Sequence, residues 1–597
     1  MAKKTKQTDS STTEVEVQTS KLSKLIIKNF RCIGSTPVTI DLNEIVVLVG
    51  ANNVGKSSIL KAYEIIMSDN SKGIELEIED YPNHEIDEDN LPEIELHLIV
   101  TSSGVSEKWL QPTDNPNEFL VRERWTWDIE RKSKKVGWNV SIGDWDKDSY
   151  PFGPGGIANA RRPEPHPVYA FSDPKVQADN ITKLLKAFLT EKVNSLKPKE
   201  GEENEFTKVL AKIHEIQKWI LTETKAQIDT VNSELTSLIE KIFPKHKVDF
   251  DVKTDSAIDP TAIFFKSDSQ LLMGTDDHLS PIEKQGSGAR RTLLWAALKY
   301  ISENKPKATK AKEKELAEVS QPKSHLLLID EPEICLHPTA IRDACHVLYE
   351  LPKTGNWQVM VTTHSPIFID FSRDNTTIVK VERNNAGIIE GTTVFRPDRA
   401  QLGEDDKKNL KLLNLCDPYV AEFFFGGKVI VVEGDTEYTA FNYIIESKPT
   451  LYKDIHIIRA RGKATIVSLI KILNHFGSSY SVLHDSDRPK NKNGDGNPAW
   501  GNNPNILAAI NSKPVGTKSR LIASLPNFEE AYFGEAISTE KPYSALTTIS
   551  TDTKKFEIIE KLLQALTNHD KSLPENCTEW SSIDELEKSL NSVLTTK

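Results

Sequence analysis

The chain has 597 residues, and its 75 lysine and arginine residues are outnumbered by 87 aspartate and glutamate residues, which gives a formal net charge of −12. This length allows about four domains and a core that folds without disulfides. The acidic balance excludes a general basic coat for nucleic acid, but not a local basic groove. The five cysteines form no C-x-x-C pair, and no apolar run approaches the roughly 20 residues that cross a bilayer. Since residues 1–20 lack the apolar core of a secretory signal, we expect a soluble, cytoplasmic protein without membrane association.

Strands and helices alternate in the predicted structure that follows the first twenty residues. Residues 1–20 are rich in Ser, Thr and charge and are expected to form a disordered tail. Continuous apolar runs predict buried strands at 45–49, 326–329 and 358–361, and an alternating pattern predicts a half-buried strand at 93–100. Continuous runs are typical of strands with both faces covered, so the pattern predicts an α/β protein with a parallel sheet.

A block of helical periodicity interrupts this pattern at residues 174–245. Apolar residues follow helical spacing from Ile181, again from Phe206, and again from Val231, which predicts two or three long helices. We expect a helical arm that serves in dimerisation; the alternative is that these helices simply cover the sheet. The first domain is therefore expected in two parts, 21–173 and 246–395.

A second α/β domain is predicted after a junction at residues 396–425. Its apolar runs predict strands at 429–432, 455–458 and 481–483. The domain is expected to span residues 426–550. The last residues, 551–597, are expected to form a helical segment.

A phosphate-binding loop follows the strand at 45–49. Residues 50–57 read Gly-Ala-Asn-Asn-Val-Gly-Lys-Ser, which matches G-x-x-x-x-G-K-[ST], and an amphipathic helix comes next. Glycines in such a loop let backbone N–H groups surround phosphate oxygens at a helix N-terminus. We expect Lys56 to reach the β- and γ-phosphates of ATP and Ser57 to bind Mg²⁺. The candidate nucleotide-contacting residues of this loop are Gly50, Asn52, Asn53, Gly55, Lys56, Ser57 and Ser58.

The next part of the nucleotide site is predicted at the ends of two later strands. Asp330 follows the strand 326–329 and is expected to support Mg²⁺, while Glu331 is placed to polarise a water. The alternative is that these two carboxylates cap a helix. His364 ends the following strand and is a candidate sensor of the γ-phosphate.

These motifs resemble the ABC-type ATPase heads of the structural-maintenance-of-chromosomes (SMC) and RecF group, and residues 25–31 look like the opening strand of such a head. The resemblance implies that ATP lies between two heads and that a signature motif of one head contacts the γ-phosphate held by the other. Residues 285–291 stand at the signature position, and Ser287 and Gly288 are the candidate contacts. Their sequence departs from the usual Leu-Ser-Gly-Gly-Gln form. At least a homodimer is therefore implied.

A second group of acidic residues follows two strands of the C-terminal half. Glu433 and Asp435 come after the strand 429–432, and Asp485 and Asp487 come after the strand 481–483. Alternation along an extended chain points Asp485 and Asp487 to one side, and neighbouring strand ends of an open α/β sheet face one crevice. Such a carboxylate cluster is suited to two Mg²⁺ or Mn²⁺ ions roughly 3.5–4 Å apart, which assist phosphodiester cleavage. The alternative is solvated acids at strand ends.

This half of the chain resembles a Toprim domain, whose signature is a glutamate followed by D-x-D. An ABC-type ATPase followed by Toprim is the arrangement of the OLD (overcoming lysogenization defect) nuclease family, which includes Gabija-like proteins. The resemblance implies an α/β fold in which an ABC-type head with an inserted helical arm precedes a Rossmann-like Toprim domain. It also implies that Glu437 is a second metal ligand of the first motif, that Glu529 rather than Glu530 is a later ligand, and that Lys541 stabilises the developing phosphate charge.

Contacts to DNA phosphates are expected from local basic clusters. These clusters are Arg122 with Arg124, residues 131–135, Arg161 with Arg162, and residues 488–492. Tryptophans near the first clusters could stack on bases; the alternative, which we favour, is that they belong to the strand core. They are Trp125, Trp127, Trp138 and Trp145.

Together the motifs and the family resemblance imply an ATP-regulated, divalent-metal-dependent DNA endonuclease of the OLD type, and our hypothesis is a role in antiphage defence. It would act alone, with a helicase-like partner, or with a retron reverse transcriptase and its msDNA. One alternative is a DNA clamp or scaffold that uses ATP without cleavage, which the full carboxylate set disfavours. Another is a Toprim topoisomerase or primase-like enzyme, although no winged-helix tyrosine segment is evident. The patterns do not determine the DNA specificity or whether one or both strands are cut. They also do not determine whether ATP activates or inhibits cleavage.

Overall fold

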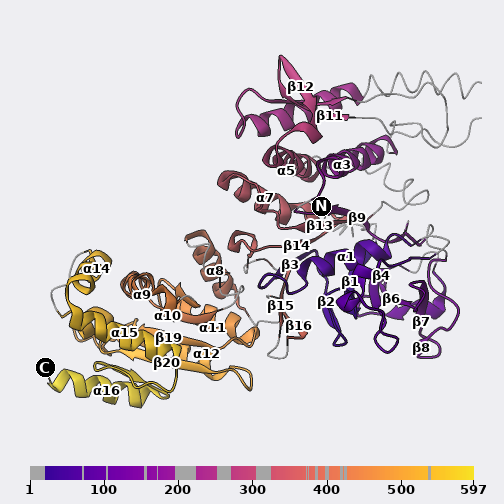
Figure 1. Ribbon diagram of the computed structural model, residues 1–597. Helices are drawn as coiled ribbons and strands as arrows, with labels where there is room; N and C mark the ends of the chain where they lie inside the picture. Colours follow the sequence, from indigo (N-terminus) through magenta and orange to yellow (C-terminus); the bar gives the residue numbers. More distant parts are fainter. Residues whose placement is uncertain are drawn as a thin grey trace, which may run out of the picture.

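The computed structural model describes most of the chain as two α/β lobes, with the first lobe in indigo to magenta and the second in orange to yellow (Figure 1). The described residues are 20–69, 73–101, 105–153, 158–159, 161–170, 172–194, 224–251, 270–303, 324–370, 373, 375–383, 387–396, 402–416, 421–422, 427–452, 454–491, 493–534 and 540–596. The predicted tail, except for Ser20, and the middle of the predicted arm lie outside these residues.

A mixed sheet forms the centre of the first lobe, with strand order β16-β15-β3-β14-β13-β9. All neighbouring pairs are parallel except β15 and β16. The strands are β3 (Ile45–Val49), β9 (Glu164–Val168), β13 (His325–Asp330), β14 (Trp357–Thr362), β15 (Thr376–Arg383) and β16 (Ile389–Phe395). The apolar run of β3 is buried throughout, because Ile45, Val47 and Val49 face one core and Val46 and Leu48 face the other.

An antiparallel sheet with the order β2-β1-β4-β6-β7-β8 packs across one of these cores, and β5 pairs with β6. Helix α1 (Lys56–Ile66) contributes Ile59, Leu60 and Tyr63 to this core, which joins the two sheets. The strands are β1 (Lys21–Lys28), β2 (Val38–Asp41), β4 (Glu93–Val100), β5 (Gln111–Pro112), β6 (Phe119–Trp127), β7 (Ser133–Asn139) and β8 (Asp144–Trp145).

Helices cover the other face of the central sheet, and they include both described ends of the predicted arm. These helices are α3 (Pro174–Asn194), the helix 224–240, α5 (Ser287–Glu303) and α7 (Pro338–Glu350). Ile181 of α3 and Val231 of the helix 224–240 are buried in the same core as Leu293 of α5. A small sheet of β10 (Lys247–Asp251), β11 (Gln270–Thr275) and β12 (His278–Pro281) lies next to them. The described ends of residues 174–245 therefore pack on the head, and dimerisation through this segment stays a prediction.

The second lobe is built on a sheet with the order β18-β17-β19-β20-β21, in which only the last pair of the described strands is antiparallel. The strands are β17 (Lys428–Val432), β18 (Ile455–Arg459), β19 (Tyr480–Asp485), β20 (Ser519–Ser524) and β21 (Cys577–Glu579). The helices are α9 (Asp435–Ser447), α10 (Pro449–Tyr452), α11 (Lys463–His475), α12 (Asn503–Asn511), α13 (Phe528–Tyr532), α14 (Lys541–Thr551), α15 (Thr553–Thr567) and α16 (Ile583–Thr596).

The C-terminal segment differs from the prediction of a purely helical region. Residues 551–597 contribute α15 and α16, but they also contribute β21, which extends the sheet by pairing Glu579 with Ile522. The strand has three residues, one of them charged, so it carries too short an alternation to be recognised from the sequence. The segment is therefore part of the second lobe.

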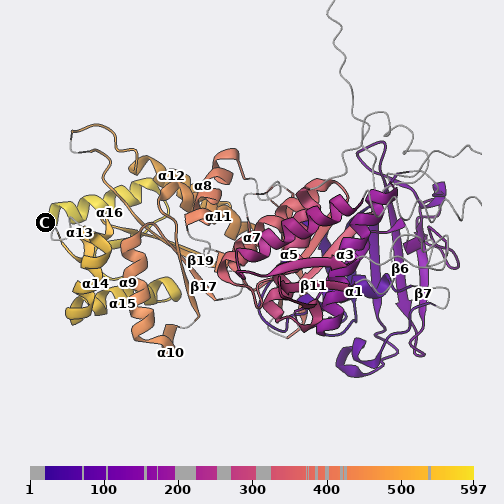
Figure 2. The same cartoon turned by 90° about the horizontal axis from the view of Figure 1, so that it is seen from above.

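The junction between the lobes contains α8 (Glu404–Cys416), which lies against α11 (Figures 1 and 2). The Asp406 carboxylate accepts hydrogen bonds from the Ser468 hydroxyl (2.8 Å) and the Lys471 ammonium (2.5 Å), both on α11. These contacts attach the junction helix to the second lobe. Within the described residues, no helix combines the length and the apolar character that a membrane span needs.

Candidate functional site

The loop between β3 and α1 has the conformation that a phosphate-binding loop requires. Gly50 and Gly55 have positive φ angles of +140° and +96°, a region that residues with a Cβ avoid. A Cβ on Gly50 would lie 2.1 Å from the Val381 carbonyl oxygen. Asn53 also has a positive φ, of +59°, and its carbonyl accepts hydrogen bonds from Arg383. Asn52 is exposed, whereas Ser58 points inward, with its hydroxyl 3.4 Å from the Cys32 thiol.

Lys56 lies at the centre of this loop. Its ammonium donates hydrogen bonds to the carbonyls of Gly50 (3.1 Å) and Ala51 (2.8 Å) and lies 2.9 Å from His364 Nε2. Burial lowers the pKa of Lys56, although nearby carboxylates oppose this shift, with Glu331 the strongest of them. Burial, and then the charge of Lys56, lowers the pKa of His364. A phosphate in the loop would therefore meet a cation and a neutral imidazole.

Asp330 and Ser57 form a pair of oxygen donors beside the loop. The Ser57 hydroxyl donates to Asp330 Oδ1 (2.9 Å), and the Thr362 hydroxyl donates to the same oxygen (2.6 Å). A hydroxyl and a carboxylate are oxygen ligands of the kind that Mg²⁺ takes together with phosphate oxygens, so this donor set fits a magnesium ion.

Glu331 follows Asp330 with a left-handed backbone (φ +50°) that turns its carboxylate toward His364, 3.6 Å away. Burial, and then the charge of Asp330, raises the pKa of Glu331.

Glu333 was not singled out from the sequence, although it belongs to the same Asp-Glu-Pro-Glu run. It accepts hydrogen bonds from the His364 backbone N–H (2.6 Å) and the Thr363 hydroxyl (2.9 Å). Glu333 therefore fixes the backbone that presents His364.

The predicted signature segment includes the N-terminus of α5, which packs against the turn that follows Asp330. Gly288 lies so close to the Cys335 carbonyl that a Cβ would be 2.8 Å from its oxygen. One turn later, Arg291 donates a hydrogen bond to the Glu331 carbonyl (2.8 Å). Ser287 and Gly288 are thus held at a helix N-terminus, and their contact with a nucleotide bound by a second head remains a prediction.

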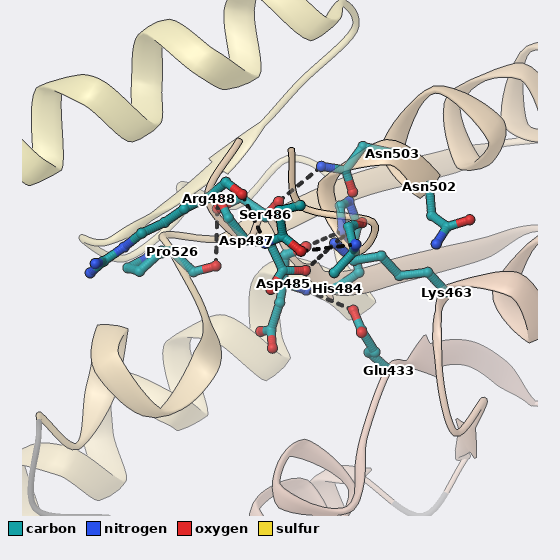
Figure 3. A network of polar contacts seen from close by, with 12 residues as sticks. Glu433, Lys463, His484, Asp485, Ser486, Asp487, Arg488, Asn502, Asn503 and Pro526 are labelled. Atoms are coloured by element: carbon teal, nitrogen blue, oxygen red, sulfur yellow. Dashed lines mark hydrogen bonds and ion pairs between the residues drawn. The ribbon is translucent and has the colours of Figure 1, made fainter. Parts of the chain in front are cut away.

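The second candidate site is formed by carboxylates at the ends of β17 and β19, which are parallel neighbours (Figure 3). Glu433 directly follows β17, and Asp485 is the last residue of β19. The Asp485 backbone N–H donates a hydrogen bond to Glu433 Oε2 (3.1 Å). The sequence motif and the fold therefore agree that these two residues meet.

Asp487 reaches this site by a turn rather than by strand alternation. It lies two residues beyond the strand end with a φ of +59°, so the alternation that we expected to align it with Asp485 does not extend to it. Its backbone N–H donates to the Pro526 carbonyl (2.7 Å), and its carboxylate accepts from Lys463 Nζ (2.5 Å). The carboxylate of Asp485 accepts from the Phe528 N–H (2.8 Å) instead. Asp435 does not join the cluster, because it pairs with Arg459 at 2.7 Å and is half exposed.

Glu437, Glu529 and Lys541 surround the same site. Glu437 is buried on α9, next to Thr436, whose hydroxyl donates to Glu529 Oε1 (2.8 Å). Lys541 Nζ lies 3.4 Å from that same oxygen. Glu530 instead pairs with Arg488 (2.9 Å), so the structure places Glu529 and not its neighbour beside the cluster.

Burial and mutual repulsion make this cluster electrostatically costly without cations. Burial, and then the charges of Glu437, Glu433 and Glu529, raises the pKa of Asp485 well above its usual range. Burial also raises the pKa of Glu433, against the lowering effect of Lys463, and raises that of Glu437 to about 8. The carboxylate oxygens of these described residues do not come together as three donors within 4.8 Å of one another, and bound cations would draw them closer. The chemistry of this donor set fits divalent metal ions.

Two further features support the cluster: Lys463, which the sequence suggested only as a phosphate or backbone contact, and His484, which was not singled out. Lys463, at the start of α11, is buried and holds Asp487; its signal is Arg-Gly-Lys after a strand end. His484 is fully buried: its Nδ1 lies 2.7 Å from the Asp485 carbonyl oxygen, and its Nε2 accepts from Trp580 Nε1 (3.1 Å). Burial lowers the pKa of His484 to about 3, so the ring is neutral. Through Trp580, the C-terminal segment thus contacts β19, the strand that carries Asp485.

One expected DNA contact is wrong, and two of the four tryptophans are core residues, whereas Trp138 and Trp145 are half-buried. Arg162 is fully buried and donates two hydrogen bonds to Glu123, at 2.9 and 2.7 Å, because a buried charge needs a partner. Trp125 and Trp127 are buried in the strand core. Arg124 pairs with Glu95 (2.8 Å), which leaves less charge for phosphate binding at this position.

Comparison with known proteins agrees with this geometry. The AAA ATPase domain family matches residues 21–131 and 170–369, more than half of the chain. The chain belongs to this family. The Toprim domain of overcoming-lysogenization-defect-like proteins matches residues 424–487, which include Glu433, Asp485 and Asp487. The resemblance inferred from the motifs is confirmed, and so is the fold class of an ATPase head followed by a Toprim domain.

Two curated relatives resemble the chain over most of its length. One is "Old nuclease" of Escherichia phage P2, 24% identical over 490 residues that make up 79% of this chain and 78% of that protein. The other is "Endonuclease GajA" of Bacillus cereus (strain VD045), 22% identical over 79% of this chain and 76% of that protein. Among solved structures, the SMC head domain from Thermotoga maritima is 14% identical and covers 63% of this chain and 98% of that one, with a TM-score of 0.30.

The metal-free protein is expected to lose stability as the pH rises. The pKa of Glu437 is raised in the folded state, from 4.5 to about 8, so its protonated form stabilises the fold. This contribution is fully present below about pH 4.5 and is lost as the pH rises to about 8. We expect Tm, measured by scanning fluorimetry in a chelator, to fall over this interval, and to fall less in Glu437→Gln or with saturating Mg²⁺. Glu446→Gln, exposed on the same helix, is the matched control. An unchanged pH slope in Glu437→Gln would contradict the burial of this carboxyl group.

Proposed function

We propose that the chain is an ATP-dependent DNA endonuclease whose cleavage site is the carboxylate cluster of the Toprim domain. The observation that carries this proposal is the contact between Glu433 and Asp485 at the ends of two parallel strands, with further acidic groups nearby. In the proposal the metal ligands are Glu433, Glu437, Asp485, Asp487 and Glu529. They would hold two Mg²⁺ or Mn²⁺ ions.

Divalent cations at this position supply charge neutralisation and activation of water for phosphodiester hydrolysis. Glu433 and Asp485 are positioned for them by the two strand ends and by the backbone N–H groups of Asp485 and Phe528. Lys541 is half exposed beside Glu529, where its ammonium would meet the negative charge that develops on the phosphate. Arg488 directly follows Asp487, and its half-exposed side chain pairs with Glu530 and points away from the cluster (Figure 3); there it would contact the DNA backbone.

The nucleotide site would regulate this activity through paired heads. Lys56 and the loop residues Gly50, Asn52, Asn53 and Gly55 would surround the phosphates, and Ser58, whose hydroxyl points inward, would take part through its backbone. Ser57 and Asp330 would hold one Mg²⁺, Glu331 would polarise the attacking water, and His364 would contact the γ-phosphate. Ser287 and Gly288 of a second copy would complete the site, which makes the active form a homodimer or a larger assembly of the same chain.

The biological role that we propose is antiphage defence. The support is the similarity to a protein named as a phage nuclease and to one named endonuclease GajA. The protein would act alone, with a helicase-like partner, or as the effector of a retron with its reverse transcriptase and msDNA. A clamp without cleavage would not need the acidic cluster, because buried carboxylates of raised pKa weaken a fold that binds no cation there.

The test is cleavage of plasmid and linear DNA by the purified protein with Mg²⁺, Mn²⁺ or chelator, each with and without ATP. Cleavage that requires the metal supports the proposal. A covalent protein–DNA adduct with relaxation of supercoils would favour a topoisomerase, and DNA binding without cleavage under every condition would favour a clamp.

Glu529 and Glu530 provide a matched pair for assigning the cluster. Glu529→Gln is expected to lower the cleavage rate by about tenfold to a thousandfold, because one anionic ligand is lost beside Lys541. Glu530→Gln is expected to retain most of the activity, since Glu530 pairs with Arg488 at the surface. The measurement is the initial cleavage rate under saturating metal. A larger loss in Glu530→Gln than in Glu529→Gln would show that the ligand assignment is wrong.

A further inference from the structure

Two histidines and a glutamate meet at the end of the central ATPase sheet that is opposite to the nucleotide loop. Glu164 and His166 lie two residues apart on β9, so their side chains share one face of the strand. His325 is the first residue of β13 and pairs with Glu164 in the parallel register. Asp330, at the nucleotide site, is the last residue of the same strand. The full length of β13 therefore lies between His325 and the nucleotide site.

The donor atoms of these three side chains converge on one point. His166 Nε2 lies 3.1 Å from His325 Nδ1, which lies 3.8 Å from Glu164 Oε2. All three atoms are within 4.8 Å of one another, and this is the one such triple of His, Cys, Asp or Glu among the described residues. A tetrahedral zinc ion with bonds of about 2.0–2.1 Å holds its donors about 3.3–3.4 Å apart. The separation of 3.1 Å, which without a metal is a hydrogen bond between the two rings, and the separation of 3.8 Å lie on either side of this value.

The surroundings favour a built site over an accidental surface cluster. His166 and His325 are 6% and 7% exposed, and the indole of Trp357 lies against both rings, with centroid distances of 5.1 and 4.7 Å. The Glu164 side chain is 39% exposed, which gives an ion and its water ligands a way in. Two imidazoles with one carboxylate suit zinc, whereas Mg²⁺ prefers oxygen donors throughout.

We propose that Glu164, His166 and His325 bind a zinc ion that fastens β9 to the ATPase sheet. β9 is the edge strand, and β13 is its one partner among the described strands. Pro165 and Pro167 deprive it of outward-facing N–H groups, so it cannot gain stability from a further strand. A metal bridge between β9 and β13 adds a link that hydrogen bonds along this strand do not provide. The site is separate from the cation positions proposed at the Toprim cluster and the nucleotide loop.

The test uses the full-length protein with Lys56→Ala, Asp485→Asn and Asp487→Asn, so that the other cation sites are weakened. After treatment with a chelator and exposure to zinc in excess Mg²⁺, the metal content is measured by mass spectrometry and the zinc affinity by competition with a chromogenic chelator. We expect about one zinc per chain, a rise in Tm of a few degrees with zinc, and the visible absorption of tetrahedral Co²⁺ when cobalt replaces it.

Variants of the triad then identify the ligands. Glu164→Gln and His166→Gln are expected to weaken zinc binding at least about tenfold and to lose the zinc-dependent rise in Tm. His97→Gln, in which another buried histidine loses its contact with Glu95 (2.6 Å), is the matched control and should bind zinc normally. If His166→Gln fails to fold, Glu164→Gln and the cobalt spectrum still test the zinc site. Glu164 is partly exposed, so its substitution is expected to leave the fold intact. Zinc binding that is absent from the parent protein, or equal in the parent and in Glu164→Gln, would overturn the proposal.

Discussion

Asp485→Asn is expected to reduce DNA cleavage by at least about a thousandfold while ATP hydrolysis stays near the wild-type rate. The substitution removes the carboxylate from the cluster, where Asp485 lies half-buried between Glu433 and the Phe528 N–H. The amide oxygen of Asn can still accept the Phe528 hydrogen bond, so the strand end is expected to keep its conformation. The measurement is the initial cleavage rate with saturating Mn²⁺, alongside phosphate release from ATP by the same preparation.

A matched control separates this effect from general damage to the second lobe. Asp570→Asn changes an exposed carboxylate of the same lobe and is expected to leave cleavage unchanged. The metal-free Asp485→Asn protein should be at least as stable as the wild type, since it lacks a carboxyl group whose ionisation is opposed by burial and by the neighbouring carboxylates. Cleavage at the wild-type rate in Asp485→Asn would mean that DNA is cut elsewhere in the molecule.

The second large effect is expected at the nucleotide site. Glu331→Gln should lower ATP hydrolysis by about a hundredfold to ten-thousandfold, the usual contribution of a catalytic base, with little change in ATP binding. Glu331 lies next to His364 and keeps a raised pKa, whereas Lys56 and the loop, which would hold the phosphates, remain intact. Phosphate release and binding of a fluorescent ATP analogue measure the two properties separately.

The same variant also tests the pairing of heads. If ATP lies between two heads, slow hydrolysis should prolong the dimer, and light scattering should show a larger ATP-dependent increase in mass than for the wild type. Glu382→Gln, an exposed change on β15, is the control for both assays. Loss of ATP binding in Glu331→Gln, or unchanged hydrolysis, would contradict the role proposed for this residue.

Features that depend on local sequence could be predicted well. The apolar run Ile45–Val49 predicts a strand buried on both faces, and the two cores on either side of β3 account for that burial. The pattern predicts that the loop needs glycine at positions 50 and 55. The positive φ angles of Gly50 and Gly55 give the physical reason. The pairing of Ser57 with Asp330, which are 273 residues apart, followed from recognising both motifs rather than from either alone.

Features that depend on distant partners could not be predicted in this way. Arg162 has the same charge as an exposed arginine, and only Glu123, 39 residues away, explains its burial. Asp487 reaches the cluster because the Pro526 carbonyl and Lys463 hold the turn beyond β19, which strand alternation cannot reveal. The contact of Trp580 with His484, 96 residues away, depends on β21, a strand too short to have a pattern of its own.

The most direct test of two separate cation-dependent sites in one chain is anomalous diffraction from crystals grown with Mn²⁺ and a non-hydrolysable ATP analogue. We expect two manganese peaks roughly 3.5–4 Å apart among Glu433, Asp485 and Asp487, and a third peak beside Ser57 and Asp330. Manganese at the nucleotide site with no peak between Glu433 and Asp485, in crystals that retain cleavage activity, would contradict the assignment of the nuclease centre.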